Sequence, residues 1–189
     1  MKKILLILLF AVFYTSVNAQ CSVTSSTNAS ALTCGTAPLS ACGGVLYLGD
    51  GTNVMNLKMN ANLNLECLGV IQLIVRNNAT LDYSGDNKDL RLASGSSIIF
   101  QQGSALYSGA SNECSASDRI YIGGNTVGAC NGGANAASFE SIFANGGINE
   151  AGVLSGSQYI CTNGTTTTTT FSSTSSGGTW SSGSPSVAT

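Results

Sequence analysis

Histidine is absent from the 189 residues, and its absence excludes several kinds of chemistry. Without an imidazole there is no Ser-His-Asp or Cys-His catalysis, no histidine general base and none of the commonest metal sites. A zinc site is further disfavoured because the seven cysteines contain no C-x-x-C pair. We therefore predict that the chain uses no metal or cofactor and that its function lies in a surface rather than in a reaction centre.

Charged residues are also scarce, at 8% of the chain, and Asn, Ser, Thr and Gly take their place. Two of the seven basic residues lie in a predicted export signal, so five remain against nine acidic ones, a net charge of −4. This weak acidity argues against nucleic acid and anionic membrane surfaces as partners. A neutral surface rich in hydroxyls and amides suits a secreted protein that contacts sugars, other proteins or solids.

The longest apolar run is too short to span a bilayer and has the order of a secretory signal peptide. Lys2 and Lys3 precede the apolar residues 4–13, and a small-residue motif ends at Ala19. Residues 1–19 are therefore predicted to be removed, with cleavage before Gln20. The mature chain is expected to be extracellular or on the outer cell surface, without a membrane span.

All seven cysteines lie in the predicted exported part, where disulfides are the default state. Cys114 and Cys130 flank a short predicted strand, 119–122, and are expected to form one bridge. Another bridge is expected from the N-terminal group, which comprises Cys21, Cys34 and Cys42. Cys67 lies on the apolar face of an alternating segment and is predicted to be a free core residue.

Thirteen residues, from Met55 to Cys67, alternate apolar and polar without a break. A period of two predicts a strand pattern with one dry face and one wet face, because a helix would distribute the apolar residues around its circumference. The wet face is mainly Asn, which is common where strands stack into ladders.

Shorter apolar pairs recur along the chain, separated by corners rich in Gly and Asn, which accept left-handed backbone angles. The expected inward pairs are 63/65, 71/73, 81/83, 90/92, 98/100 and 105/107. Three such steps make a coil of roughly 24 residues, and each coil needs neighbours to cover its apolar side. We predict an all-β, right-handed β-helix (solenoid) over 45–161, with an N-terminal cap segment over 20–44. An antiparallel β-sandwich is the alternative, disfavoured because tight Asp-Gly or Asn-Gly hairpins are scarce.

The pattern changes after Cys130. Phe139, Ile142 and Phe143 have helical spacing within 136–145, which predicts one or two helical turns packed on the solenoid. Residues 162–189 contain a run of six threonines and are predicted to be a linker or the start of a further module.

One cluster of charged residues is a candidate contact site for a ligand, and it comprises Asp82, Asp86, Asp89 and Arg91. Enzymes with a β-helix fold that cut acidic polysaccharides use Asp with Arg or Lys, sometimes through calcium. The spacing does not match a calcium-binding loop, and a charged, solvated corner is the simpler interpretation. Tyrosines such as Tyr83 offer rings to sugars, although such residues more often end a strand with a hydrogen-bonded hydroxyl.

Several features resemble large, repetitive, adhesin-like surface proteins exported by gliding, type IX-secreting bacteria. They are the signal ending in Ala19 and Gln20, the alternating Asn and Thr-rich strands, the segment CSASDRIYIGGNTVGACNGG (114–133) and the ending GTWSSGSP (178–185). The resemblance implies β-helical or β-sandwich modules and an adhesive role. Those proteins carry a C-terminal sorting domain, and none is visible in this sequence.

We predict a secreted or cell-surface structural or adhesive module that presents a neutral Asn, Thr and Ser-rich surface and has no catalytic activity. Its expected partners are polysaccharide or other cell-surface components. The alternative function is a carbohydrate-binding or polysaccharide-lyase-like β-helix. Ice binding is disfavoured because no T-x-T ladder repeats along the strands.

Overall fold

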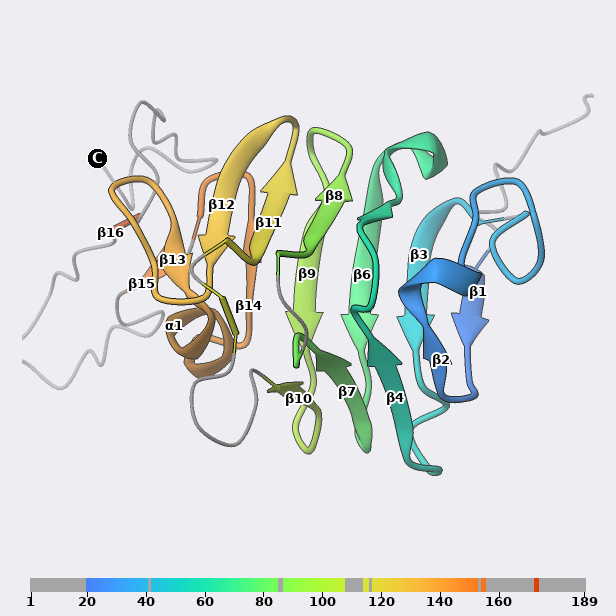
Figure 1. The fold of residues 1–189 in the computed structure, drawn as a ribbon. Coiled ribbons are helices and arrows are strands. Elements are labelled where there is room, and N and C mark those ends of the chain that lie inside the picture. Colours follow the sequence, from blue (N-terminus) through green and yellow to red (C-terminus); the bar gives the residue numbers. More distant parts are fainter. Residues whose placement is uncertain are drawn as a thin grey trace, which may run out of the picture.

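The computed structural model describes residues 20–40, 42–84, 87–107, 114–115, 117–152, 154–155 and 172–173. Short strands and corners wind into three consecutive coils that stack along one axis (Figure 1). The coils are β3 (Gly44–Leu48), β4 (Met55–Lys58) and β5 (Leu63–Asn64); then β6 (Ile71–Val75), β7 (Ala79–Asp82) and β8 (Asp89–Leu92); then β9 (Ser97–Phe100), β10 (Ala105–Tyr107) and β11 (Arg119–Ile122). The predicted signal, 1–19, and nearly all of 162–189 lie outside the described residues.

Corresponding strands of successive coils pair in parallel and build three sheets. Sheet A contains β3, β6 and β9, sheet B contains β4, β7 and β10, and sheet C contains β5, β8 and β11. Met55 of the first coil, for example, aligns with Ala79 of the second, 24 residues further on. This pairing confirms the β-solenoid and excludes the antiparallel sandwich, in which paired neighbours run in opposite directions.

Apolar residues point inward in rows that run from coil to coil. In sheet A, Leu46, Leu73 and Ile98 are in register, and each is 1% exposed. Burial of one such side chain contributes about 1.5–3 kcal/mol, so this hydrocarbon column holds the coils together. The first five predicted inward pairs are all buried.

The sixth predicted pair, 105/107, is wrong by one residue. The inward residues near β10 are Ser104, which is buried, and Leu106, which aligns with Leu81 and packs against the core. The hydroxyl of Ser104 donates to the carbonyl of Gln101 (2.6 Å). An inward serine with a satisfied hydroxyl does not appear in an apolar pattern, and this explains the error.

The long alternation from Met55 to Cys67 is not one continuous strand. It forms β4, a corner, β5 and the 3₁₀ turn η2 (Glu66–Leu68). Met59 lies in the corner and is fully buried, so the inward phase continues around the bend. The period of two therefore reports which side chains point inward, and it does not report where each strand ends.

The N-terminal segment extends two sheets before it covers the end of the stack. β1 (Gln20–Val23) pairs in parallel with β3, and β2 (Thr27–Asn28) pairs in parallel with β4. After the 3₁₀ turn η1 (Ala29–Ala31), the chain forms loops at this end of the molecule (Figure 1). Leu39 in these loops is 1% exposed and belongs to the hydrophobic core.

The opposite end is closed by strands and a short helix. β12 (Asn125–Ala129) pairs antiparallel with β11, and β13 (Ala137–Ser138) follows it in sheet C. Next come α1 (Phe139–Ala144) and β14 (Gly147–Asn149), which pairs antiparallel with β9. The predicted helical turns are confirmed, with Phe139 and Ile142 buried and Phe143 exposed beside Phe100. β15 (Leu154–Ser155) and β16 (Ser172–Ser173) form a separate antiparallel pair.

Asparagines at the corners tie neighbouring coils together. Asn78 has a left-handed backbone (φ 62°), and its side-chain amide donates to the carbonyl of Thr52, 26 residues earlier (3.0 Å). Asn60 exchanges two hydrogen bonds with Ser30 of the preceding turn. The wet face of the alternation therefore forms ladders between coils, but the partners are Ser, Asp and backbone groups rather than further asparagines.

Candidate functional site

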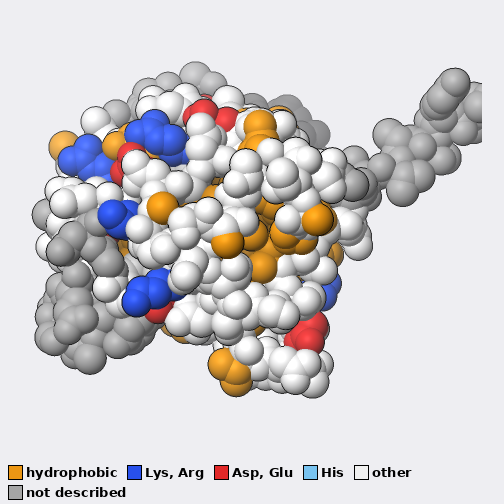
Figure 2. Space-filling view, turned by 45° about the vertical axis from the view of Figure 1, so that its right-hand side comes forward, with side chains coloured by type: hydrophobic (Ala, Val, Ile, Leu, Met, Phe, Trp, Pro, Cys, Tyr) orange, Lys and Arg blue, Asp and Glu red, His pale blue; other side chains and the backbone are white. Residues whose placement is uncertain are grey.

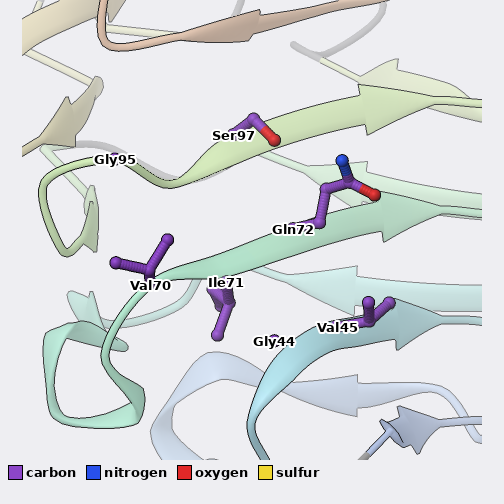
Figure 3. A pocket seen from close by; sticks show the side chains of 7 residues that line it. All are labelled: Gly44, Val45, Val70, Ile71, Gln72, Gly95 and Ser97. Atoms are coloured by element: carbon purple, nitrogen blue, oxygen red, sulfur yellow. The ribbon is translucent and has the colours of Figure 1, made fainter. Parts of the chain in front are cut away.

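The outward face of sheet A carries two regular rows of side chains. Val45, Gln72 and Ser97 form one row, and Tyr47, Ile74 and Ile99 form the next. Figure 3 shows Val45, Gln72 and Ser97 on the same side of three neighbouring strands, with Ile71 on the opposite side. A row that mixes one aliphatic, one amide and one hydroxyl side chain therefore lies beside an apolar row, with neighbours in each row about 4.8 Å apart.

A shallow hollow of about 310 Å³ opens where the strands of sheet A begin. It is lined by Gly44, Val45, Val70, Ile71, Gln72, Gly95 and Ser97 (Figure 3). Val70 is 60% exposed at its rim, an unusual exposure for a large apolar side chain. The hollow therefore offers aliphatic contact together with the polar groups of Gln72 and Ser97.

Charge is scarce on this face, although the Glu150 carboxylate accepts a hydrogen bond from the backbone N–H of Gly95, which lines the hollow (2.9 Å). The outward residues of its four parallel strands are Gln20, Ser22, Val45, Tyr47, Gln72, Ile74, Ser97 and Ile99. Arg76 follows β6, and its guanidinium carbon lies 3.5 Å from the centre of the Tyr47 ring. Such stacking is a cation–π contact, which places one positive charge at the border of an uncharged face. We name the eight outward residues and the hollow the sheet A face.

The predicted charged cluster is divided between two strands. Asp82 on β7 is buried and accepts hydrogen bonds from the Asn56 amide (2.9 Å) and the Ser84 backbone N–H (2.8 Å). Asp89 and Arg91 on β8 form an ion pair of 2.8 Å. Asp86 lies outside the described residues. The structure thus brings Asp89 and Arg91 together, whereas both oxygens of Asp82 are occupied by other partners.

Arg91 also contacts an aromatic ring on sheet C. Its guanidinium carbon lies 4.1 Å from the centre of the Tyr121 ring on β11. The hydrogen bond that Arg91 donates to the Asp89 carboxylate raises the pKa of Arg91 above its usual value. The group therefore remains a cation, and its side chain is 36% exposed. It is a partly exposed cation on sheet C that is already paired with Asp89.

Tyr83 does not present its ring to a ligand. Its side chain is fully buried against Phe139, with ring centres 4.7 Å apart, and its hydroxyl donates to the carbonyl of Arg119 (3.4 Å). Burial raises the pKa of this hydroxyl well above its usual value, and the charge of Asp118 adds to the effect. For Tyr83, the expectation of a hydrogen-bonded hydroxyl at the end of a strand is therefore correct, and the ring is not offered to a sugar.

Three disulfides connect the described cysteines, as expected for an extracellular protein: Cys21–Cys42, Cys34–Cys67 and Cys114–Cys130. The last one is the bridge predicted from the flanked strand. The prediction that Cys67 is a free core residue is wrong, because η2 turns the chain outward after Leu65 and leaves Cys67 exposed. Cys161 lies outside the described residues.

The described part of the chain contains no group of three His, Cys, Asp or Glu side chains arranged to hold a metal ion. It also contains no helix that is long and apolar enough to cross a membrane. No protein family, curated protein or solved structure matches this chain.

Sequence reasoning missed the sheet A face, although a signal was present. The segments GVLYL (44–48) and IQLIV (71–75) contain apolar residues in both phases of the period of two. Only one phase is needed for the core, so Val45, Tyr47 and Ile74 are apolar residues that the core does not use. An apolar residue in the outward phase is the feature that marks this face.

Proposed function

We propose that the chain is a non-catalytic structural and adhesive module that is secreted or displayed on the cell surface. The observation that carries the proposal is the sheet A face, where four strands present uncharged amide, hydroxyl and apolar side chains in register. Interface centres are commonly poor in charge and enriched in aromatic residues and Arg, and this face has Tyr47 with Arg76 stacked on its ring. Figure 2 shows that most of the surface visible in that view is neutral and polar.

The rigidity of the solenoid supports this role. Each strand of the central coil is hydrogen-bonded on both sides, and corner asparagines add ties between coils. A face built on such strands keeps its side chains in place before contact, so little conformational entropy is lost on binding. The three disulfides are consistent with an extracellular location. The resemblance to exported adhesin-like proteins points to the same role.

The test measures retention of the mature chain on neutral solids, namely cellulose particles, chitin particles and polystyrene beads. Gln72→Glu adds a charge to the sheet A face without changing side-chain shape and is expected to weaken retention about tenfold, or about 1.4 kcal/mol. Gln102→Glu is the matched control, because this exposed residue lies in a corner outside the face. Equal retention of both variants, or no retention of the unmodified chain on any solid, would refute the proposal.

A second candidate, carbohydrate binding or lyase activity toward acidic sugars, is favoured by the exposed Arg91 guanidinium on sheet C. A uronic acid carboxylate would compete with Asp89 for this group. The mature chain is incubated with uronic-acid polysaccharides and calcium while the absorbance of unsaturated products is followed. A signal that disappears in Arg91→Ala would replace the adhesive proposal with an enzymatic one.

A further inference from the structure

We propose that the N-terminal loops act as a latch that low-molecular-weight thiols release by reducing the two disulfides that hold it. The latch comprises residues 29–40 and 42–43, which cover the end of the stack where β1 and β2 lie (Figure 1). Its release would uncover the adjacent end of the hydrophobic core. The inference concerns this end of the solenoid and is independent of the sheet A face.

The backbone of the latch is bonded mainly to itself. Its backbone hydrogen bonds are short-range, from Leu32 to Ala29, Thr36 to Thr33, Leu39 to Thr36 and Cys42 to Leu39. The strands differ, because their backbone groups pair with the next coil in every sheet. A segment whose backbone hydrogen bonds are mainly local opens at lower free energy than a paired strand. Side-chain contacts and covalent bonds must therefore hold the latch against the rest of the solenoid.

Those ties lie at identifiable places. Ser30 exchanges two hydrogen bonds with Asn60 at the start of the latch, Ala29 and Leu39 are buried in the core, and Leu32 packs against it. The Cys34–Cys67 disulfide joins the middle of the latch to η2, and the Cys21–Cys42 disulfide joins its end to β1. The two disulfides thus tie the middle and the end of a segment whose backbone pairs with no strand.

Accessibility separates these two bridges from the third. Cys67 is exposed, and Cys21, Cys34 and Cys42 are partly exposed, whereas Cys114 and Cys130 are each 7% exposed. Exchange requires a thiolate to reach a sulfur, so access controls which bridge reacts first. Cys67 is the most exposed residue of the six, so Cys34–Cys67 is expected to open first.

The reaction is balanced by two molecules of thiol. A thiolate attacks the sulfur of Cys67, a mixed disulfide forms, and the sulfur of Cys34 leaves as a thiolate that takes a proton from water. A second thiolate attacks the sulfur of the first thiol, which releases Cys67 as a thiolate and forms the oxidised thiol dimer. Two electrons pass from the thiols to the protein disulfide, and the latch keeps only its non-covalent ties.

The experiment treats the mature chain with increasing reduced glutathione, alkylates free thiols at intervals and maps them by peptide mass spectrometry. Cys34 and Cys67 are expected to be alkylated about tenfold faster than Cys114 and Cys130. Hydrogen exchange of 29–40 should rise in the same samples, while β6 and β9 keep their protection. Opening of Cys114–Cys130 first or at the same rate would overturn the proposal, as would unchanged exchange in the latch after Cys34–Cys67 has opened.

The double variant Cys34→Ser with Cys67→Ser removes one tie without any thiol. Fast exchange in 29–40 of the untreated variant supports the latch, and exchange as slow as in the unmodified chain contradicts it. If this variant fails to fold, the thiol treatment of the native chain decides the question alone. The comparison of Gln72→Glu with Gln102→Glu tests the sheet A face with all disulfides intact, whereas thiol treatment and hydrogen exchange test the latch, so failure of one proposal is distinguishable from failure of the other.

Discussion

At the scale of single residues, the corners of the solenoid depend on side chains that satisfy backbone groups. Asp50 illustrates this between β3 and β4. Its carboxylate accepts hydrogen bonds from the backbone N–H groups of Thr52 (2.7 Å) and Asn53 (2.8 Å) and from the Asn53 amide (2.7 Å). Asp is favoured at such turns because its short side chain reaches the backbone two residues on.

These bonds lower the pKa of Asp50 from 3.8 to about 2, with the Asn53 backbone N–H as the largest cause and the Asn53 side chain next. A folded-state pKa below the unfolded value means that this contribution to stability is complete above pH 3.8 and is lost as the pH falls through 2. We expect Asn53→Ala to raise the pKa of Asp50, measured from its carboxyl carbon chemical shift during an NMR pH titration. Asn60→Ala at another corner should leave it unchanged. A value that stays near 2 in Asn53→Ala would show that the side-chain bond is unimportant.

Two neighbouring glycines differ sharply in what surrounds them. A methyl group on Gly147 (φ 149°) would overlap the carbonyl oxygen of Ile98 in the paired strand β9. Gly146 also has a left-handed backbone (φ 74°), but nothing lies within 4 Å of the added carbon. Gly147→Ala is expected to cost at least about 2 kcal/mol of unfolding free energy in urea, because the backbone must shift.

Gly146→Ala is the control and should cost about 1–2 kcal/mol, the usual strain of a left-handed alanine. Equal losses in the two variants would mean that β14 adjusts its position on β9 without penalty.

At the scale of elements, most strands follow from apolar spacing, whereas their ends depend on corners. The inward pairs from 63/65 to 98/100 were predictable because the core requires them. The pair at 105/107 was not, because Ser104 occupies an inward position with a hydrogen-bonded hydroxyl. The Cys34–Cys67 bridge was hidden for a similar reason, since the 3₁₀ turn η2 reverses the phase after Leu65. The apolar period of two predicts which side chains are buried in regular strands. An irregular turn such as η2 shifts this period and so changes which of the following residues are buried.

Helix α1 provides a prediction at this scale. Ser138 precedes it with an extended backbone, and its hydroxyl oxygen accepts a hydrogen bond from the N–H of Ser141 (3.1 Å). Ser138→Ala is expected to lower the unfolding free energy by about 1 kcal/mol through loss of this cap. Ser117→Ala, outside the helix, is the control. Because α1 covers the end of the core through Phe139 and Ile142, an unchanged stability would indicate that packing alone fixes the helix.

At the scale of the whole molecule, stacking of coils produces both the core and the surface. The register that aligns Leu46, Leu73 and Ile98 inside the solenoid also aligns Tyr47, Ile74 and Ile99 outside it. The inward rows satisfy the core, so the outward apolar row is available for contact with another body. The fold was predictable from the inward rows, whereas the candidate surface required the register between strands, which no single segment contains.

The most direct test of the adhesive face is side-chain footprinting by hydroxyl radicals on the chain bound to a neutral solid. We expect Tyr47, Ile74 and Val70 to be oxidised more slowly when the chain is bound, while Tyr121 on sheet C is oxidised at the same rate in both states. Protection of Tyr121 with no change at Tyr47 and Ile74 would contradict the assignment of adhesion to sheet A.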